Sequence, residues 1–274
     1  MTVAEALRAA AARLATTSDT ARLDAELLMA HALGVSRSDM LLRHPADSVP
    51  EAFAPLIMRR AAHEPIAHII GHQEFYGREF IVTPDVLIPR ADSESVVEAA
   101  LAAAPRAQRV LDLGTGSGAL MLTLLAEMPM TTGVGVERSG KARVVAQNNA
   151  ASLGLAGRAE IRAGDWTARG WADDLGTFDL VIANPPYVET GADLAPDVRD
   201  FEPAEALFAG AEGLDDYRII APQLPGLLTD QGIAVLEIGA SQGDAVTKIA
   251  EDQGFATQIV KDLAGRDRAV VLRH

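Results

Sequence analysis

The chain has 274 residues, of which 49% are hydrophobic and 23% are charged, and this composition excludes disordered and fibrous proteins. Its length allows a catalytic domain with a second, smaller domain. The formal net charge of −14 argues against direct nucleic-acid binding, because sequence-independent affinity depends on Lys and Arg. The absence of cysteine excludes disulfides and thiolate metal ligands, and no segment has the pattern of a signal peptide or a membrane span. We therefore expect a cytoplasmic protein without membrane contact.

The first 72 residues have the pattern of short helices. A capping box is predicted at Thr2, leucines within residues 23–33 share one helical face, and Gly34 is placed to end that helix. Pro50 suits the first turn of a further helix. Because this region has no nucleotide-binding motif, we predict that residues 1–72 form a helical domain that recognises the substrate.

Residues 73–90 are predicted to link two domains. Aromatic and β-branched residues surround Gly77 between Gln73 and Pro84, which is typical of a β-hairpin. The pattern changes again after this segment, so the second domain is placed at residues 91–274.

The second domain alternates strands with helices. Such alternation predicts an α/β fold with a Rossmann-like, mainly parallel sheet covered on both faces. A short turn around Gly265 leaves no room for a crossover helix, so the last strand is expected to run antiparallel. The predicted strands are 109–113, 132–137, 159–163, 178–183, 232–238, 257–260 and 269–272.

A glycine-rich turn follows the first strand of this sheet. Glycine permits positive φ and lets backbone N–H groups approach a ligand at the start of the next helix. Glu137 ends the following strand, where a carboxylate can accept hydrogen bonds from ribose hydroxyls. The pattern predicts a pocket for an adenosine-containing cofactor but does not distinguish a dinucleotide from other adenosine compounds. The turn consists of Gly114, Thr115, Gly116, Ser117 and Gly118.

Asp165 and Trp166 follow the third predicted strand. Asp165 is a candidate acceptor for an adenine amino group, and Trp166 is a candidate aromatic wall. Taken alone, an isolated tryptophan is more often a packing residue.

The sequence Asn184-Pro185-Pro186-Tyr187 follows a buried strand, at the edge where open α/β sheets bind ligands. The prolines have fixed φ and no N–H, so the loop is stiff and rich in acceptors. The Asn184 side-chain oxygen and the Pro185 carbonyl can each accept one N–H of a planar NH₂ group and hold its nitrogen toward a methyl donor. Tyr187 can pack against that group and approach a sulfonium, a contact worth about 0.5–2 kcal/mol. The loop predicts methyl transfer to an amide or exocyclic nitrogen.

Together, the glycine turn and this loop resemble those of the amino-methyltransferases, and the whole chain resembles the peptide chain release factor glutamine methyltransferases. The order and spacing of several further stretches carry the narrower resemblance. Ala91, Ser93 and Glu137 depart from the proline, threonine and aspartate usual in the family. The shared stretches are 64–71 with Glu74 and Phe75, 87–90 with Asp92 and Glu94, 200–203 with 206–208, 237–239 with Gln242, and 261–268.

The resemblance implies an S-adenosylmethionine-dependent enzyme that methylates the glutamine of a Gly-Gly-Gln motif in a release factor. By position, it implies cofactor contacts from 114–118, Glu137, Trp166 and Asn184, and substrate contacts from 184–187. We add Asp165 to the cofactor site and assign catalysis to Asn184, Pro185 and Tyr187. The expected protein is a monomer with a release factor as its partner.

Other functions remain open from the residues alone. A ribosomal-protein glutamine and a nucleic-acid adenine are alternative methyl acceptors, although the segment 89–94 favours a release factor and the acidic charge disfavours nucleic acid. The glycine motif also permits a nicotinamide oxidoreductase, and the helical region permits a non-catalytic adaptor. We expect no metal site, because the spacing of His63, His68 and His72 does not place all three on one helical face.

Overall fold

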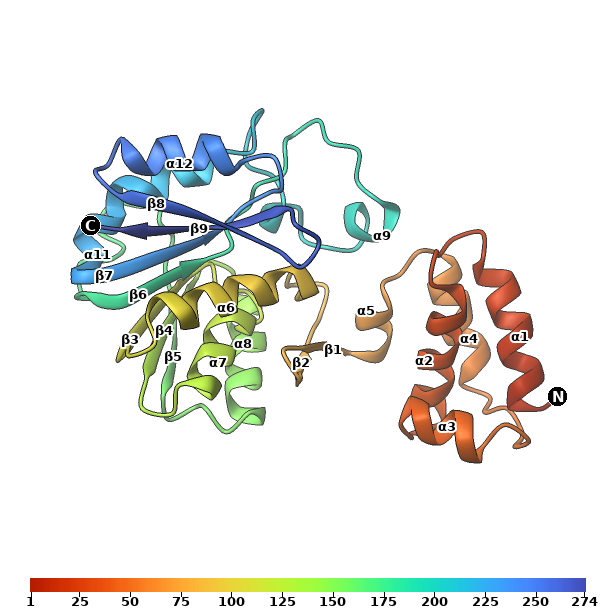
Figure 1. Cartoon of the computed structure of the whole chain (residues 1–274). Coiled ribbons are helices and arrows are strands. Elements are labelled where there is room, and N and C mark those ends of the chain that lie inside the picture. The colour runs from red at the N-terminus through yellow and green to blue at the C-terminus, as the bar shows by residue number, and fades with distance from the viewer. The chain divides into compact units, whose positions relative to one another are not determined.

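The computed structural model describes residues 1–274, which form two compact units (Figure 1). The first, here named the helical unit, consists of Met1–His72 together with Leu194–Glu202. The second, here named the sheet unit, consists of Gln73–Asp193 and Pro203–His274. The chain therefore leaves the sheet unit after Asp193 and returns to it at Pro203.

The helical unit is built around a small apolar core. Its α1 (Val3–Leu14) begins with the expected capping box, in which the Thr2 side chain accepts from the Glu5 N–H. Gly34 ends α2 (Ala21–Leu33) in the left-handed conformation, at φ 66°. The prediction for Pro50 is wrong: α4 begins only at Phe53, after a turn. The other helices of this unit are α3 (Arg37–Arg43), α4 (Phe53–Ala61), α5 (Ile66–Ile70) and α9 (Pro196–Arg199).

A buried ion pair joins two of these helices. Arg60 Nε on α4 donates to Asp24 Oδ2 on α2 at 2.7 Å, and both side chains are more than nine-tenths buried. Ser18 and Thr20 also donate to the Asp24 carboxylate, so its charge is satisfied by several hydrogen bonds. Removing one member of such a pair would leave a buried charge without compensation.

A β-hairpin opens the sheet unit, with strands β1 (His72–Phe75) and β2 (Arg78–Ile81). Phe75 and Phe80 pack edge to face in the core. The buried Asn149 side chain accepts from the Ile81 N–H at 2.7 Å and donates to the Ile81 carbonyl at 3.0 Å, so it pairs with β2 as a neighbouring strand would. Its Nδ2 also donates to the Ser117 carbonyl at 2.8 Å, which ties the hairpin to the glycine turn.

The main sheet has seven strands in the order β5-β4-β3-β6-β7-β9-β8. Neighbouring strands from β5 to β7 are parallel, and β9 is antiparallel to both β7 and β8. The predicted fold class, including the antiparallel last strand, is confirmed. The strands are β3 (Arg109–Leu113), β4 (Thr132–Glu137), β5 (Ala159–Ala163), β6 (Phe178–Ala183), β7 (Leu228–Glu237), β8 (Ala256–Lys261) and β9 (Asp267–Arg273).

Helices cover both faces of this sheet (Figure 1). Alternate residues of β3 point to opposite faces, so that Val110 joins one core and Leu111 the other. One face packs against α6 (Glu94–Ala103), α7 (Ala119–Glu127) and α8 (Gly140–Ser152). The other packs against α10 (Asp215–Ile220), α11 (Leu224–Leu227) and α12 (Gly243–Glu251). Short 3-10 helices are η1 (Ala91–Ser93), η2 (Ala204–Ala206) and η3 (Ala221–Gln223).

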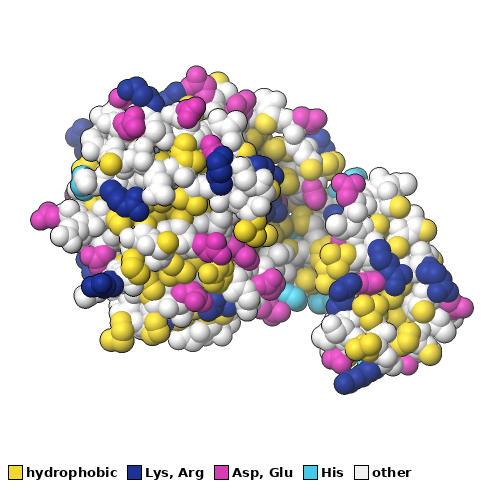
Figure 2. All heavy atoms as spheres, in the orientation of Figure 1, with side chains coloured by type: hydrophobic (Ala, Val, Ile, Leu, Met, Phe, Trp, Pro, Cys, Tyr) yellow, Lys and Arg dark blue, Asp and Glu magenta, His cyan; other side chains and the backbone are white.

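Charge is distributed unequally along the chain. Residues 1–72 contain seven Arg and eight Asp or Glu, so nearly all of the net charge of −14 belongs to the remaining residues. Figure 2 shows acidic side chains spread over the visible face of the sheet unit and several basic side chains on that of the helical unit. No helix is both long and apolar enough to cross a lipid bilayer.

Candidate active site

A cavity of about 250 Å³ lies in the sheet unit, at the carboxyl ends of the central strands. Ligands of open α/β folds bind at this edge, where connections leave adjacent strands toward opposite faces of the sheet. Most of the predicted site residues line the cavity, whereas Gly118, Pro185 and Tyr187 do not. Those that line it are Gly114, Thr115, Gly116, Ser117, Glu137, Asp165, Trp166, Asn184 and Pro186.

The glycine turn forms the wall that follows β3. Gly114 and Gly116 have positive φ values of 72° and 54°, which L side chains rarely adopt. A Cβ atom on Gly114 would lie 3.0 Å from Cη2 of Trp166, so the indole ring packs directly against the turn. Gly118 instead serves the helix that follows, because a Cβ atom there would lie 2.7 Å from Cδ1 of Leu122 on α7.

The Glu137 carboxylate is held in place by the loops beside it. Its Oε2 accepts the Gly116 N–H at 3.1 Å, and its Oε1 accepts the Ser139 N–H at 2.8 Å. Each carboxylate oxygen has two lone pairs, so both can still accept a hydrogen bond from a ligand in the cavity. The side chain is thus fixed in position before any ligand arrives.

Trp166 and Asp216 form a second polar wall of the cavity. Trp166 Nε1 donates to Asp216 Oδ1 at 2.8 Å, which fixes the plane of the indole ring. Burial raises the pKa of the Asp216 carboxyl. This effect exceeds the opposite effect of the hydrogen bond from Trp166, so the pKa is raised overall. Asp165 is oriented by Thr167, whose N–H and hydroxyl donate to its Oδ1 at 2.9 and 2.6 Å. Asp216 was missed in the sequence, because its role depends on α10 packing beside Trp166.

The loop after β6 brings Asn184 and Pro186 to the cavity but directs Tyr187 elsewhere. The Tyr187 ring packs in the core, with its hydroxyl near the buried Glu237, and burial raises its pKa to about 12. The structure does not bring the Tyr187 ring to the cavity lining, so its predicted contact with a substrate stays a prediction. Pro185 is buried and does not belong to the cavity lining, so its proposed contact with a substrate also stays a prediction.

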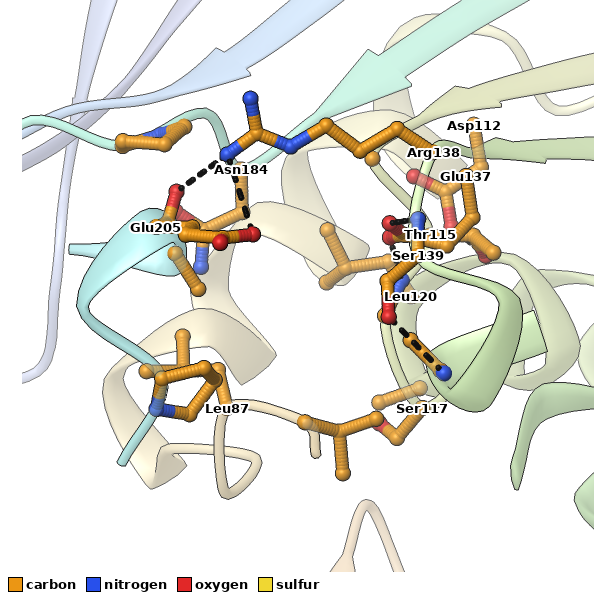
Figure 3. A pocket seen from close by; sticks show the side chains of 18 of the residues that line it. Leu87, Asp112, Thr115, Ser117, Leu120, Glu137, Arg138, Ser139, Asn184 and Glu205 are labelled. Atoms are coloured by element: carbon orange, nitrogen blue, oxygen red, sulfur yellow. Dashed lines mark hydrogen bonds and ion pairs between the residues drawn. The ribbon is translucent and has the colours of Figure 1, made fainter. Parts of the chain in front are cut away.

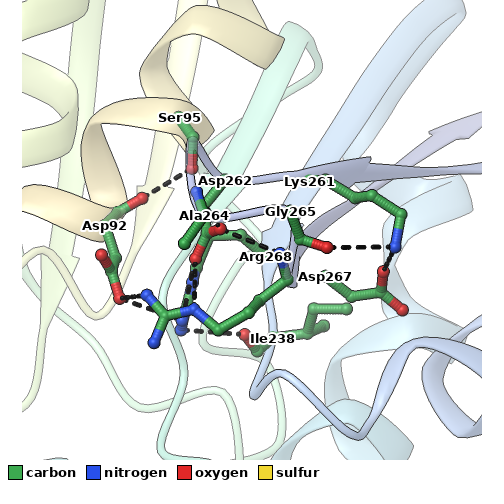
Figure 4. Close-up of polar contacts among 10 residues, drawn as sticks. Asp92, Ser95, Ile238, Lys261, Asp262, Ala264, Gly265, Asp267 and Arg268 are labelled. Atoms are coloured by element: carbon green, nitrogen blue, oxygen red, sulfur yellow. Dashed lines mark hydrogen bonds and ion pairs between the residues drawn. The ribbon is translucent and has the colours of Figure 1, made fainter.

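The segment before α6 supplies a further wall, from Leu87, Pro89, Arg90 and Ser93. Asp92 in this segment accepts from Arg266 and Arg268, each at 3.0 Å, and Arg268 donates to the Ile238 carbonyl at 3.4 Å (Figure 4). The stretch 261–268, which the sequence suggested only by resemblance, therefore anchors a wall of the cavity from the last hairpin of the sheet.

Comparisons with known proteins agree with this geometry. Residues 5–71 match the family model described as PrmC N-terminal domain, and residues 92–207 match that of the methyltransferase small domain. The release factor glutamine methyltransferase of Cereibacter sphaeroides is 45% identical over 280 residues, covering 100% of this chain and 99% of the relative. That of Rhodospirillum rubrum is 41% identical and covers 92% of this chain and 78% of the relative.

The chain belongs to the release factor glutamine methyltransferase family. The resemblance predicted from the sequence is thereby confirmed. A methyltransferase structure from Pyrococcus furiosus superimposes with a TM-score of 0.54 over 80% of this chain and 96% of that one. At 15% identity this likeness shows a shared fold alone.

In this member of the release factor glutamine methyltransferase family, an ion pair spans one side of the cavity (Figure 3). Arg138 Nη2 lies 3.6 Å from Glu205 Oε2 and 3.3 Å from the Glu205 carbonyl oxygen. Half of the Arg138 side chain and 76% of the Glu205 side chain are exposed, so the pair adds little stability and can open readily. Neither residue belongs to a motif, and neither was predicted as a site residue. His63, His68 and His72 join no group of three side chains able to hold a metal ion.

Two buried carboxyl groups lie close to the cavity. Burial raises the pKa of Asp112 to about 7, although Thr115 Oγ1 donates to it at 2.6 Å. Burial also raises the pKa of Glu237 to about 7, against the opposing effects of the Ser93 hydroxyl and the charge of Arg268. The Oε2 atom of Glu237 has no hydrogen-bond partner. Both groups therefore bind a proton more tightly in the folded protein than in the unfolded chain.

This difference predicts that stability falls as the pH rises. Between about pH 4.5 and 7 the folded protein binds more protons than the unfolded chain, so the free energy of unfolding decreases through this window. Glu237→Gln keeps a neutral side chain at all pH values and should remove about 2 kcal/mol of that decrease. Urea unfolding at several pH values measures how the free energy of unfolding depends on pH. Replacement of the exposed Glu251 by Gln serves as the control. A Glu237→Gln protein with the wild-type pH dependence would contradict the raised pKa.

Proposed function

We propose that this enzyme transfers a methyl group from S-adenosylmethionine to the side-chain amide nitrogen of the glutamine in a release factor's Gly-Gly-Gln motif. The observation that carries the proposal is the placement of Asn184 on the wall of the cavity that the glycine turn and Glu137 also line. Relatives named release factor glutamine methyltransferase match nearly the whole chain, which supports the same substrate.

The cavity residues suit an adenosine-containing methyl donor. Gly114 and Gly116 leave the turn without side chains where a ligand would approach the backbone, and Glu137 has acceptor capacity for ribose hydroxyls. Trp166 offers a flat apolar surface beside the acceptors Asp165 and Asp216. When bound, S-adenosylmethionine supplies an electrophilic methyl group on a positively charged sulfur.

The loop after β6 would act by positioning the amide of the substrate. The Asn184 oxygen and the Pro185 carbonyl are proposed to accept the two amide N–H groups, so that the nitrogen faces the methyl group. The prolines keep these acceptors from moving, because their φ angles are fixed. Correct placement of two reacting atoms can lower the barrier by about 7–11 kcal/mol.

This reaction does not require a strong base. An amide nitrogen becomes acidic only as it gains the methyl group, so its proton can leave late to a carbonyl oxygen or to water. Glu237 does not line the cavity, and the carboxylate of Asp112 accepts a hydrogen bond from the Thr115 hydroxyl, so neither group is assigned as the proton acceptor. We therefore assign the catalytic effect to alignment by Asn184.

Substrate selection is assigned to the helical region. We propose residues 1–72 as the recognition domain, 73–90 as the hairpin linker and 91–274 as the methyltransferase domain. Separate family-model matches to residues 5–71 and 92–207 support this division. A release factor substrate would place the activity in the cytoplasm.

The proposal is tested by methyl transfer from labelled S-adenosylmethionine to three purified acceptors. We expect transfer to the release factor, and no transfer to a ribosomal protein or to an oligonucleotide. A release factor whose motif glutamine is replaced by glutamate should accept no label, because it lacks the amide. Labelling of the ribosomal protein or the oligonucleotide in place of the release factor would refute the proposed substrate.

Asn184→Ala should lower turnover by about 10²–10³, because a positioned hydrogen bond in a water-poor site is lost. Asn184→Asp keeps an acceptor but loses the donor and adds charge, so we expect it to be partly active at best. Both variants should bind S-adenosylmethionine nearly as wild type does, since the glycine turn is unchanged. Single-turnover methylation with saturating donor measures the effect. Near wild-type rates for Asn184→Ala would exclude the proposed alignment.

Deletion of residues 1–72 should abolish the preference for an intact release factor over a short Gly-Gly-Gln peptide. Both would then be methylated with similar, low kcat/KM, whereas S-adenosylmethionine binding should persist. Circular dichroism and calorimetry must first show that the fragment is folded, because Leu194–Glu202 belongs to the same helical unit. An unchanged preference in a folded fragment would show that recognition lies elsewhere.

A further inference from the structure

The end of β7 and the segment that follows it take no part in the cavity lining. They carry the stretch Glu237, Ile238 and Gly239 with Gln242, and none of these residues lines the cavity. They nevertheless lie beside the loop that bears Asn184, because β6 and β7 pair in parallel up to Ala183 and Leu236.

The Gln242 side chain links three backbone segments. Its Oε1 accepts the Gly239 N–H at 3.0 Å. Its Nε2 donates to the Tyr187 carbonyl at 3.0 Å and to the Gly213 carbonyl at 3.1 Å. The residue is only 9% exposed, and donors and acceptors that are buried in this way are costly to leave unpaired.

Two glycines make room for this arrangement. A Cβ atom on Gly213, which has a φ of 67°, would lie 2.2 Å from the Tyr187 carbonyl oxygen and 2.7 Å from Gln242 Nε2. A Cβ atom on Gly239 would lie 2.9 Å from Gln242 Oε1. The backbone approaches the Gln242 amide as closely as it can, so the amide has little freedom to move.

The loop between β6 and Val188 is consequently fixed at both ends. Ala183 is held by the sheet, and the Val188 N–H donates to the Leu207 carbonyl at 2.8 Å. Between them, the Tyr187 carbonyl is held by the Gln242 side chain, and the φ angles of the two prolines are fixed. A change in the position of the Tyr187 carbonyl is therefore transmitted through two residues of restricted backbone freedom to Asn184.

We infer that Gln242 is a positioning residue for methyl transfer, which holds the Tyr187 carbonyl and thereby keeps the Asn184 side chain aligned with the substrate amide. This inference rests on the proposed function of Asn184. The expected effect is on turnover and not on cofactor binding, because Gln242 does not line the cavity that the glycine turn borders.

The test compares Gln242→Met, which keeps the length of the side chain but has no N–H donor, with Thr131→Val. Thr131 is also buried and donates to the Ala107 carbonyl at 2.6 Å, directly before β4 at the amino ends of the strands. We expect Gln242→Met to lower kcat about 10- to 100-fold, since small misplacements of reacting groups have effects of this size. Its KM for the release factor and its affinity for S-adenosylmethionine should change about threefold or less. Thr131→Val should lose about as much thermal stability as Gln242→Met but retain the kcat of the wild type.

Hydrogen–deuterium exchange gives a readout that does not depend on activity. Backbone amides in peptides spanning residues 182–190 should exchange faster in Gln242→Met than in the wild type. In Thr131→Val their exchange rate should equal that of the wild type. If Gln242→Met does not fold, Gln242→Glu serves instead: it retains the acceptor for Gly239 but turns an acceptor-only oxygen toward the Tyr187 and Gly213 carbonyls, so it should show the same changes at least as strongly.

Wild-type kcat in a folded Gln242 variant would overturn the inference, as would equal loss of kcat in Thr131→Val. A wild-type enzyme inactive on the release factor would instead overturn the proposed function. In that case the exchange data decide: faster exchange in residues 182–190 supports the role of Gln242 in fixing the loop, and unchanged exchange refutes it.

Discussion

The whole site depends on the hydrogen bonding of β3 to β4 on one side and to β6 on the other. Because all three strands run parallel, the glycine turn, Glu137 and Asn184 reach the same edge of the sheet from distant parts of the sequence. The connection after β3 leads to α7 on one face, whereas helices that follow β6 cover the other face. The cavity lies where these connections diverge, so the residues proposed to hold the cofactor and Asn184, proposed to hold the acceptor, line the same cavity.

Much of the fold could be predicted from the sequence because local patterns determine it. The four strands between Arg109 and Ala183 are mainly apolar or β-branched runs bounded by turns, and their observed limits equal the predicted ones, although β5 at the edge of the sheet has no fully buried residue. Strand β7 begins earlier than expected, at Leu228, because it pairs there with Phe178 across an irregular register. That pairing depends on a distant segment, so the local sequence contains no signal for it.

The site was predictable where a motif fixes the backbone, as in the glycine turn and at Asn184. It was not predictable where a side chain acts through a tertiary partner. Asp216, Arg138 and Glu205 stand in segments without any distinctive pattern, and Asn149 resembles any polar residue of a helix until β2 packs beside it. The sequence also could not indicate which way Tyr187 points, because burial of its hydroxyl near Glu237 depends on packing between β6 and β7.

The division of the helical unit into residues 1–72 and Leu194–Glu202 has a consequence for synthesis of the protein on the ribosome. The first 72 residues emerge early, but the segment that completes their unit emerges only after most of the strands. Until then, a surface that Leu194–Glu202 covers in the finished protein is exposed on the nascent chain. The last step in forming the helical unit is therefore coupled to the growth of the sheet, and a chain arrested before residue 194 would carry an incomplete helical unit.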